Sequence, residues 1–292
     1  MSEKIHLRAD DGERLDVTTR GQGTPIVLLH GWSASHAAWA PLVEPLSRHH
    51  WVIRPDARGH GQHRVSTTSA PDLARLARDL LNILDALGID QAVVAGHSMG
   101  ALTLWRFIGD FGTARLRQLC FIDQSPRLVT DAHWPHGIYG DFDAERSERF
   151  LAELQADPVE SILRLVACGR NAKALASYQR NSTGWRVLRQ ELAKLDPAPL
   201  TAIWRSLVAA DLRDVLPRID RPTLLVYGSA SNFYTEAAAR YVADHIRSAV
   251  MRCYEDADHC PHLLQHARFL DDFSQLLAAP LSAPAPAPAA TA

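Results

Sequence analysis

The sequence predicts an α/β fold with a mostly parallel eight-stranded sheet, flanked by helices and interrupted by a helical cap after its sixth strand. Two observations lead to this class. Short apolar runs alternate with longer amphipathic stretches of helical period along the 292 residues, and this alternation is typical of parallel strands joined by right-handed helical crossovers. Between Asp123 and Thr223 the strand pattern stops and only helical spacing remains.

The first two strands are expected to pair across the turn Asp10-Asp11-Gly12, and the third is a continuous apolar run that suits burial on both faces of a sheet. In chain order the expected strands are 5–8, 15–19, 25–29, 51–54, 91–95, 119–123, 223–228 and 250–254. Helices of the sheet layers are expected at 36–48, 71–87, 98–110, 235–246 and 267–277.

The inserted segment shows apolar residues at helical spacing in 145–155, 159–168 and 200–212. We therefore expect a core of 1–125 and 216–279 with a helical cap at 126–215. Residues 280–292 are an Ala/Pro/Ser run that offers too little apolar surface to offset the entropy of ordering, which predicts a disordered tail.

Composition excludes several function classes. Lys and Arg number 31 against 33 Asp and Glu, so the formal net charge of -2 gives no footprint for nucleic acid. The N-terminus lacks the apolar run of a secretory signal, and no stretch is long and uncharged enough to span a bilayer. These features predict a soluble, cytoplasmic enzyme that acts on a small molecule.

The most specific motif is Gly96-His97-Ser98-Met99-Gly100, a G-x-S-x-G between an expected strand and an expected helix. A serine on such a sharp turn has its hydroxyl lifted above the sheet edge, and the helix behind it favours developing negative charge. A serine hydroxyl needs a base to remove its proton, and His259 is the predicted general base.

In this context the chain resembles the α/β-hydrolase family from Ile5 to Leu277. Leu29-His30-Gly31-Trp32 is similar to the family's oxyanion loop, which implies that the backbone N–H groups of Trp32 and Met99 form the oxyanion hole. The stretch 56–61 resembles a structural turn of the family, and 258–262 resembles the loop that carries the catalytic histidine. The resemblance implies no metal and no organic cofactor.

The resemblance also places the triad acid after the seventh strand, but Gly228-Ser229-Ala230-Ser231-Asn232 has serine where the aspartate would stand. Some members of the family carry the acid after the sixth strand instead. Asp123 ends that strand here and is our predicted acid, ahead of Glu236 and Asp258. The order Ser98, Asp123, His259 then keeps the family's order of serine, acid and histidine.

We expect an apolar acyl substrate, with Trp32, Trp134, Tyr139 and Trp185 as contact residues. The predicted reaction is hydrolysis of a carboxylic ester or thioester through an acyl-enzyme. Acyl transfer to an amine or alcohol stays open, as does a non-enzymatic receptor role. A further alternative is cofactor-independent ring cleavage by dioxygen, because the dioxygenases of this fold also carry the acid after the sixth strand; Ala34 stands where those enzymes have a histidine.

Overall fold

The computed structural model describes residues 2–61, 63–66 and 70–280. Its eight strands form one sheet in the order β1-β2-β4-β3-β5-β6-β7-β8, in which β2 runs antiparallel to both of its neighbours and the pairs from β4 to β8 are parallel. The strands are β1 (Glu3–Arg8), β2 (Arg14–Arg20), β3 (Thr24–Leu29), β4 (His50–Pro55), β5 (Ala92–His97), β6 (Leu116–Ile122), β7 (Thr223–Gly228) and β8 (Ala249–Tyr254). The predicted fold class is confirmed.

Helices cover both faces of the sheet and form the cap. They are η1 (His36–Trp39), α1 (Ala40–Leu46), α2 (Leu73–Ala86), α3 (Met99–Phe111), η2 (Ile138–Gly140), α4 (Ala144–Ala156), α5 (Pro158–Ala167), α6 (Ala172–Gln179), α7 (Thr183–Leu192), α8 (Pro197–Ala209), η3 (Arg213–Arg218), α9 (Glu236–His245), α10 (Pro261–Leu264) and α11 (His266–Ala278). No helix among the described residues is long and apolar enough to cross a membrane.

Alternate residues of the central strands supply two hydrophobic cores, one on each face. In β3, Val27 and Leu29 belong to the core shared with α2 and α3, whereas Ile26 and Leu28 belong to the core shared with α1 and α11. This follows from the two-residue period of a strand. Burial on both faces explains why these strands are apolar throughout.

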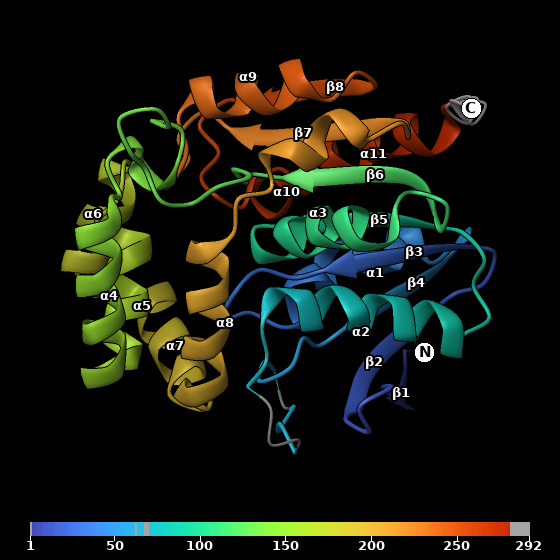
Figure 1. Ribbon diagram of the computed structural model, residues 1–292, viewed down its shortest axis with the longest axis horizontal. Helices are drawn as coiled ribbons and strands as arrows, with labels where there is room; N and C mark the ends of the chain where they lie inside the picture. Colours follow the sequence, from blue (N-terminus) through green and yellow to red (C-terminus); the bar gives the residue numbers. More distant parts are fainter. Residues whose placement is uncertain (1, 62, 67–69, 281–292) are drawn as a thin grey trace, which may run out of the picture.

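The cap helices α4 to α8 lie beyond the end of the sheet toward which β6 points (Figure 1). Ligands of open parallel sheets bind at this carboxyl end. The helical cap thus covers the edge at which the predicted site residues lie.

Two details differ from the expectations. The stretch 36–48 is not one helix, because η1 is followed by α1 with Pro41 in its first turn. The cap contains α6 and α7 in addition to the three expected helices, and α6 contains no fully buried residue. Of the expected tail at 280–292, the residues from 281 onward lie outside the described residues.

The turn at 56–61 contains a buried ion-pair network. The Arg58 guanidinium, 1% exposed, donates two hydrogen bonds to Asp79 at 2.7 and 2.8 Å and two to Asp11 at 2.6 and 2.9 Å. Gly59 and Gly61 have φ angles of 73° and 58°. The turn therefore joins β1–β2, β4 and α2, which fits the structural role that the resemblance implied.

Replacing Arg58 by Met should destabilise the protein by about 3 kcal/mol, because it leaves the Asp79 carboxylate buried with only Arg75 beside it. Urea unfolding measures the change. Arg106→Met, which breaks the partly exposed pair with Asp110, is the matched control and should cost about 0.5 kcal/mol or less. Equal losses in the two variants would contradict the importance of the network.

Candidate active site

Ser98 lies on a strained turn between β5 and α3. Its φ of 52° and ψ of -118° fall outside the regions favoured by L-residues. A Cβ on Gly96 would lie 2.4 Å from the Gly100 carbonyl oxygen, and a Cβ on Gly100 would lie 2.2 Å from that of Leu29. Only glycine fits at both positions, so the motif's glycines are required by close backbone contacts.

Asp123 follows β6, and its carboxylate is fully buried. Three donors reach it. The His259 imidazole lies 2.6 Å from Oδ2 through Nδ1, the Ser231 hydroxyl donates to the same oxygen at 2.6 Å, and the Gly228 N–H donates to Oδ1 at 3.2 Å. The carboxylate thereby joins the ends of β6 and β7 to the histidine loop.

The two alternative acids are engaged elsewhere. Glu236 forms an exposed ion pair with Arg240 one turn along α9, and Asp258 accepts the N–H of Cys260. Of the three predicted candidates, Asp123 is the one hydrogen-bonded to His259.

Burial shifts both members of this pair toward their neutral forms. It lowers the pKa of His259 to about 4, so the free imidazole is uncharged at neutral pH and able to accept a proton. Burial also raises the pKa of Asp123 to about 7, and the hydrogen bonds from Ser231 and Gly228 oppose that rise because they favour the carboxylate. Because Ser231 and Gly228 donate to the two oxygens of Asp123, this group accepts as a carboxylate, so His259 carries its proton on Nδ1 and leaves Nε2 unprotonated.

Two further side chains hold the histidine loop. His97 Nε2 donates to the His259 carbonyl at 2.9 Å, and burial lowers the His97 pKa to about 3, so this imidazole stays neutral. Asn232 Oδ1 accepts the His259 N–H at 3.2 Å, while its Nδ2 donates to the Val166 carbonyl of α5 at 2.9 Å. His259 is therefore anchored to both the turn that carries Ser98 and the cap.

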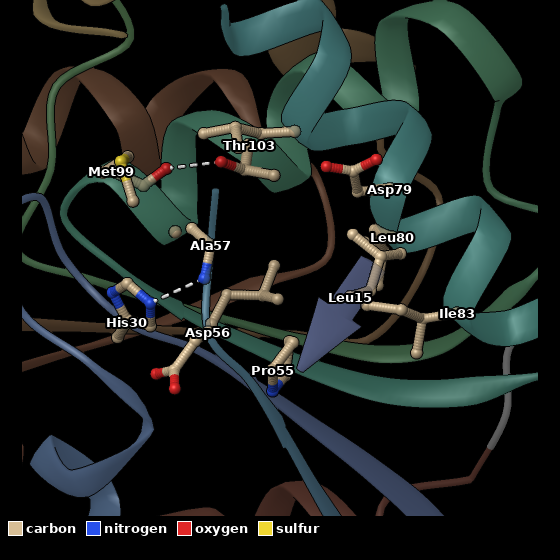
Figure 2. A pocket seen from close by; sticks show the side chains of 13 residues that line it. Leu15, His30, Pro55, Asp56, Ala57, Asp79, Leu80, Ile83, Met99 and Thr103 are labelled. Carbon is tan, nitrogen blue, oxygen red and sulfur yellow. Dashed lines mark hydrogen bonds between the residues drawn. The ribbon is translucent and has the colours of Figure 1, made fainter. Parts of the chain in front are cut away.

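The predicted oxyanion donors line the same cavity as Ser98. The backbone N–H groups of Trp32 and Met99 donate to no protein acceptor among the described residues. Two hydrogen bonds hold the main chain next to these N–H groups (Figure 2). His30 accepts the Ala57 N–H at 3.0 Å, and the Thr103 hydroxyl donates to the Met99 carbonyl at 2.9 Å. Because Nε2 of His30 accepts, Nδ1 carries the proton and donates to the Gly31 carbonyl at 2.8 Å.

A cavity of about 650 Å³ lies between this edge of the sheet and the cap. Ser98 and His259 both line it, although no hydrogen bond joins them in the described structure. Trp32 and Trp185, two of the four predicted substrate-contact residues, also line it. Exposed Leu264 marks its open side.

Trp134 and Tyr139, the other two predicted contact residues, do not line this cavity. Trp134 is buried between Tyr241 and Arg213 and donates to the Arg127 carbonyl. Tyr139 stacks on Phe233 and donates to the Leu165 carbonyl. Both rings fasten the segment after β6 to its neighbours, and no sequence period fixes side-chain direction in such an irregular segment.

Several residues of the site were not predicted. Ser231 binds the acid, and Gln124 and Trp204 line the cavity, with the Trp204 ring 4.6 Å from that of Trp32. The sequence contained an indication of the role of Ser231, because this residue stands where the family's acid is expected. For Gln124 the indication was weaker, because it consisted only of the position directly after Asp123.

Comparisons with known proteins agree with this geometry. The family model described as "alpha/beta hydrolase fold" matches residues 24–265. The chain belongs to this family. The prediction of a hydrolase-type enzyme is confirmed at this level.

Similar relatives cover nearly the whole chain of this family member. A 3-oxoadipate enol-lactonase of Acinetobacter baylyi is 30% identical and covers 94% of this chain and 97% of its own. A pimeloyl-[acyl-carrier protein] methyl ester esterase of Chromobacterium violaceum is 29% identical, with coverage of 88% and 95%. The solved structure of a hydrolase from Pseudomonas aeruginosa matches with a TM-score of 0.79 and 25% identity over 95% of this chain and 99% of that one.

Asp123→Asn should lower kcat by roughly 10⁴-fold, because an amide cannot hold His259 in the required tautomer or stabilise its protonated form. Steady-state rates with an activated ester measure the effect. Glu236→Gln, which removes the alternative acid on α9, should leave kcat within a few-fold of wild type. A near-normal rate for Asp123→Asn would assign the acid to another residue.

Ser231→Ala should move the acid limb of the kcat/KM profile to higher pH by roughly one unit, the equivalent of one lost hydrogen bond. The Ser231 bond lowers the pKa of Asp123, so its loss lets the coupled Asp123–His259 pair take up a proton at higher pH. As the solution is acidified, activity therefore begins to fall at a higher pH than in the wild type. The control is Ser229→Ala, whose hydroxyl accepts the Asp256 N–H instead; equal profiles for both variants would refute the coupling.

Proposed function

We propose that this protein is a serine hydrolase that cleaves carboxylic esters through an acyl-enzyme, with Ser98 as nucleophile, His259 as base and Asp123 as acid. The observation that carries the proposal is the buried hydrogen bond of 2.6 Å between Asp123 and His259, on the wall of the cavity that also contains Ser98. A neutral imidazole fixed by a carboxylate is the group that a serine hydroxyl requires for activation.

In this mechanism His259 Nε2 takes the proton of Ser98 Oγ while that oxygen attacks the substrate carbonyl carbon. The N–H groups of Trp32 and Met99 bind the resulting oxyanion, and Asp123 stabilises the imidazolium. The C–O bond to the alcohol breaks as His259 returns the proton to the leaving oxygen. Water, deprotonated by the same imidazole, then releases the acid and restores Ser98.

The cavity supports an apolar acyl group. Most of its buried wall is apolar, and a volume of about 650 Å³ is in the usual range for small-molecule sites. The relatives named above are, by their names, a methyl ester esterase and an enol-lactonase, and a lactone is a cyclic ester. We therefore favour an oxygen ester over a thioester.

Ser98→Ala should lower ester hydrolysis by about 10⁴-fold or more, because it removes the nucleophile. The measurement is a panel of p-nitrophenyl esters and acyl thioesters of graded acyl length, with fluorophosphonate labelling of wild type. Ser274→Ala, on α11, is the matched control and should behave as wild type.

An acyl-length optimum that is lost in Ser98→Ala but kept in Ser274→Ala would support the proposal. Folded wild-type protein that neither labels nor hydrolyses any ester would refute it. Oxygen consumption with a hydroxyquinolone in that case would favour the ring-cleaving reaction instead.

A further inference from the structure

The inner wall of the cavity contains a buried carboxamide that the mechanism does not use. Gln124 directly follows Asp123, is 2% exposed, and lines the cavity together with Ser98 and His259. The Tyr227 hydroxyl donates to its backbone carbonyl at 2.6 Å, so the main chain at this point is fixed.

The orientation of the carboxamide follows from its partners. Oε1 accepts the Ser125 N–H at 2.8 Å and the Tyr234 hydroxyl. Because a backbone N–H can only donate, the atom facing it is the oxygen and the other end is the NH₂ group. Within the described chain that Nε2 has no acceptor, and it is not among the unpaired polar atoms sealed inside protein. The surface it contacts is the cavity.

The other carboxamides on the cavity wall are already paired. Asn232 binds the His259 N–H and the Val166 carbonyl, and Asn171 donates to the Ala230 carbonyl. Gln124 thus presents a donor that is fixed in direction but has no partner. Water can reach a donor that faces the cavity, but a substrate that displaces this water without supplying an acceptor leaves the donor unpaired, which costs free energy.

We propose that Gln124 Nε2 is a specificity-determining donor for a neutral oxygen in the acyl part of the substrate, such as a keto or ether oxygen near the scissile carbonyl. The inference rests on the proposed function. Gln124 lines the same cavity as Ser98 and His259, so its carboxamide borders the space open to an acyl group carried by Ser98. In the acyl-enzyme the acyl part stays attached to Ser98 after the alcohol has left, so a donor on this wall acts on the acyl part.

The charges around Gln124 favour a neutral oxygen over a carboxylate. The Asp123 carboxylate is adjacent in the chain, and Lys173, the one Lys or Arg that the described cavity lining contains, is exposed at the rim. A carboxylate on the buried part of the acyl chain would meet negative charge without a compensating cation. The substrate class is therefore an ester of an oxo- or alkoxy-substituted acid.

The test compares p-nitrophenyl pentanoate with its ether isosteres, the ethoxyacetate and the 3-methoxypropanoate. Each kcat/KM is measured for wild type, Gln124→Met and Gln124→Glu. Met keeps the approximate shape but lacks the donor. Glu keeps an acceptor for Ser125 and Tyr234 and lacks the donor only when its carboxyl is ionised, so its ratio is read on the alkaline plateau of its pH profile. Gln91→Met, at an exposed site where Gln91 donates to the Ala114 carbonyl, is the control. Intrinsic ester reactivity cancels when the ether-to-pentanoate ratio is compared between proteins.

We expect at least one ether-to-pentanoate ratio to be about 5- to 30-fold higher in wild type and Gln91→Met than in either Gln124 variant, the range for one hydrogen bond in a buried site. Equal ratios in all four proteins would overturn the inference while leaving the hydrolase proposal intact. Should Gln124→Met fail to fold by circular dichroism, Gln124→Glu decides. Failure of wild type to label at Ser98 or to hydrolyse any of the three esters would count instead against the proposed function.

Discussion

The arrangement of the site depends on the burial of one negative charge. Asp123 is fully enclosed where β6 ends, and such a carboxylate is tolerated only when hydrogen-bond donors replace water. Its three donors come from the histidine loop, from the end of β7 and from the loop that follows β7. Meeting this requirement fixes the imidazole, so the same contacts that make the charge tolerable also position the predicted base.

Ser231 shows how the chain accommodates an acid on β6 rather than β7. Its hydroxyl donates to Asp123 and also accepts the N–H groups of Phe233 and Tyr234 at 3.2 Å each. A second carboxylate at this position would lie against the first and raise its pKa by repulsion. A small neutral donor is compatible with the acid at 123, which accounts for the departure from the family pattern.

The parts of the molecule that the sequence predicted well are those fixed by short-range pattern. The alternation of strands and helices, the strained turn at Ser98 and the histidine loop each depend on a few neighbouring residues. The contacts that it did not predict depend on tertiary packing. Helix α6 contains no fully buried residue, so no regular spacing of buried positions marks it in the sequence. Trp134 and Tyr139 lie in an irregular segment, where contacts with Tyr241, Arg213 and Phe233 set the directions of their side chains.

The Asn232 side chain links the cap to the loop that carries His259. One end of its carboxamide holds the backbone of His259, and the other holds a carbonyl of α5. Displacement of α5 would therefore be transmitted to the imidazole rather than absorbed by a loose hinge. In this architecture the helical insertion is not a freely exchangeable module: a foreign cap grafted onto the sheet must present a carbonyl at the place of Val166 to keep both ends of the Asn232 carboxamide hydrogen-bonded.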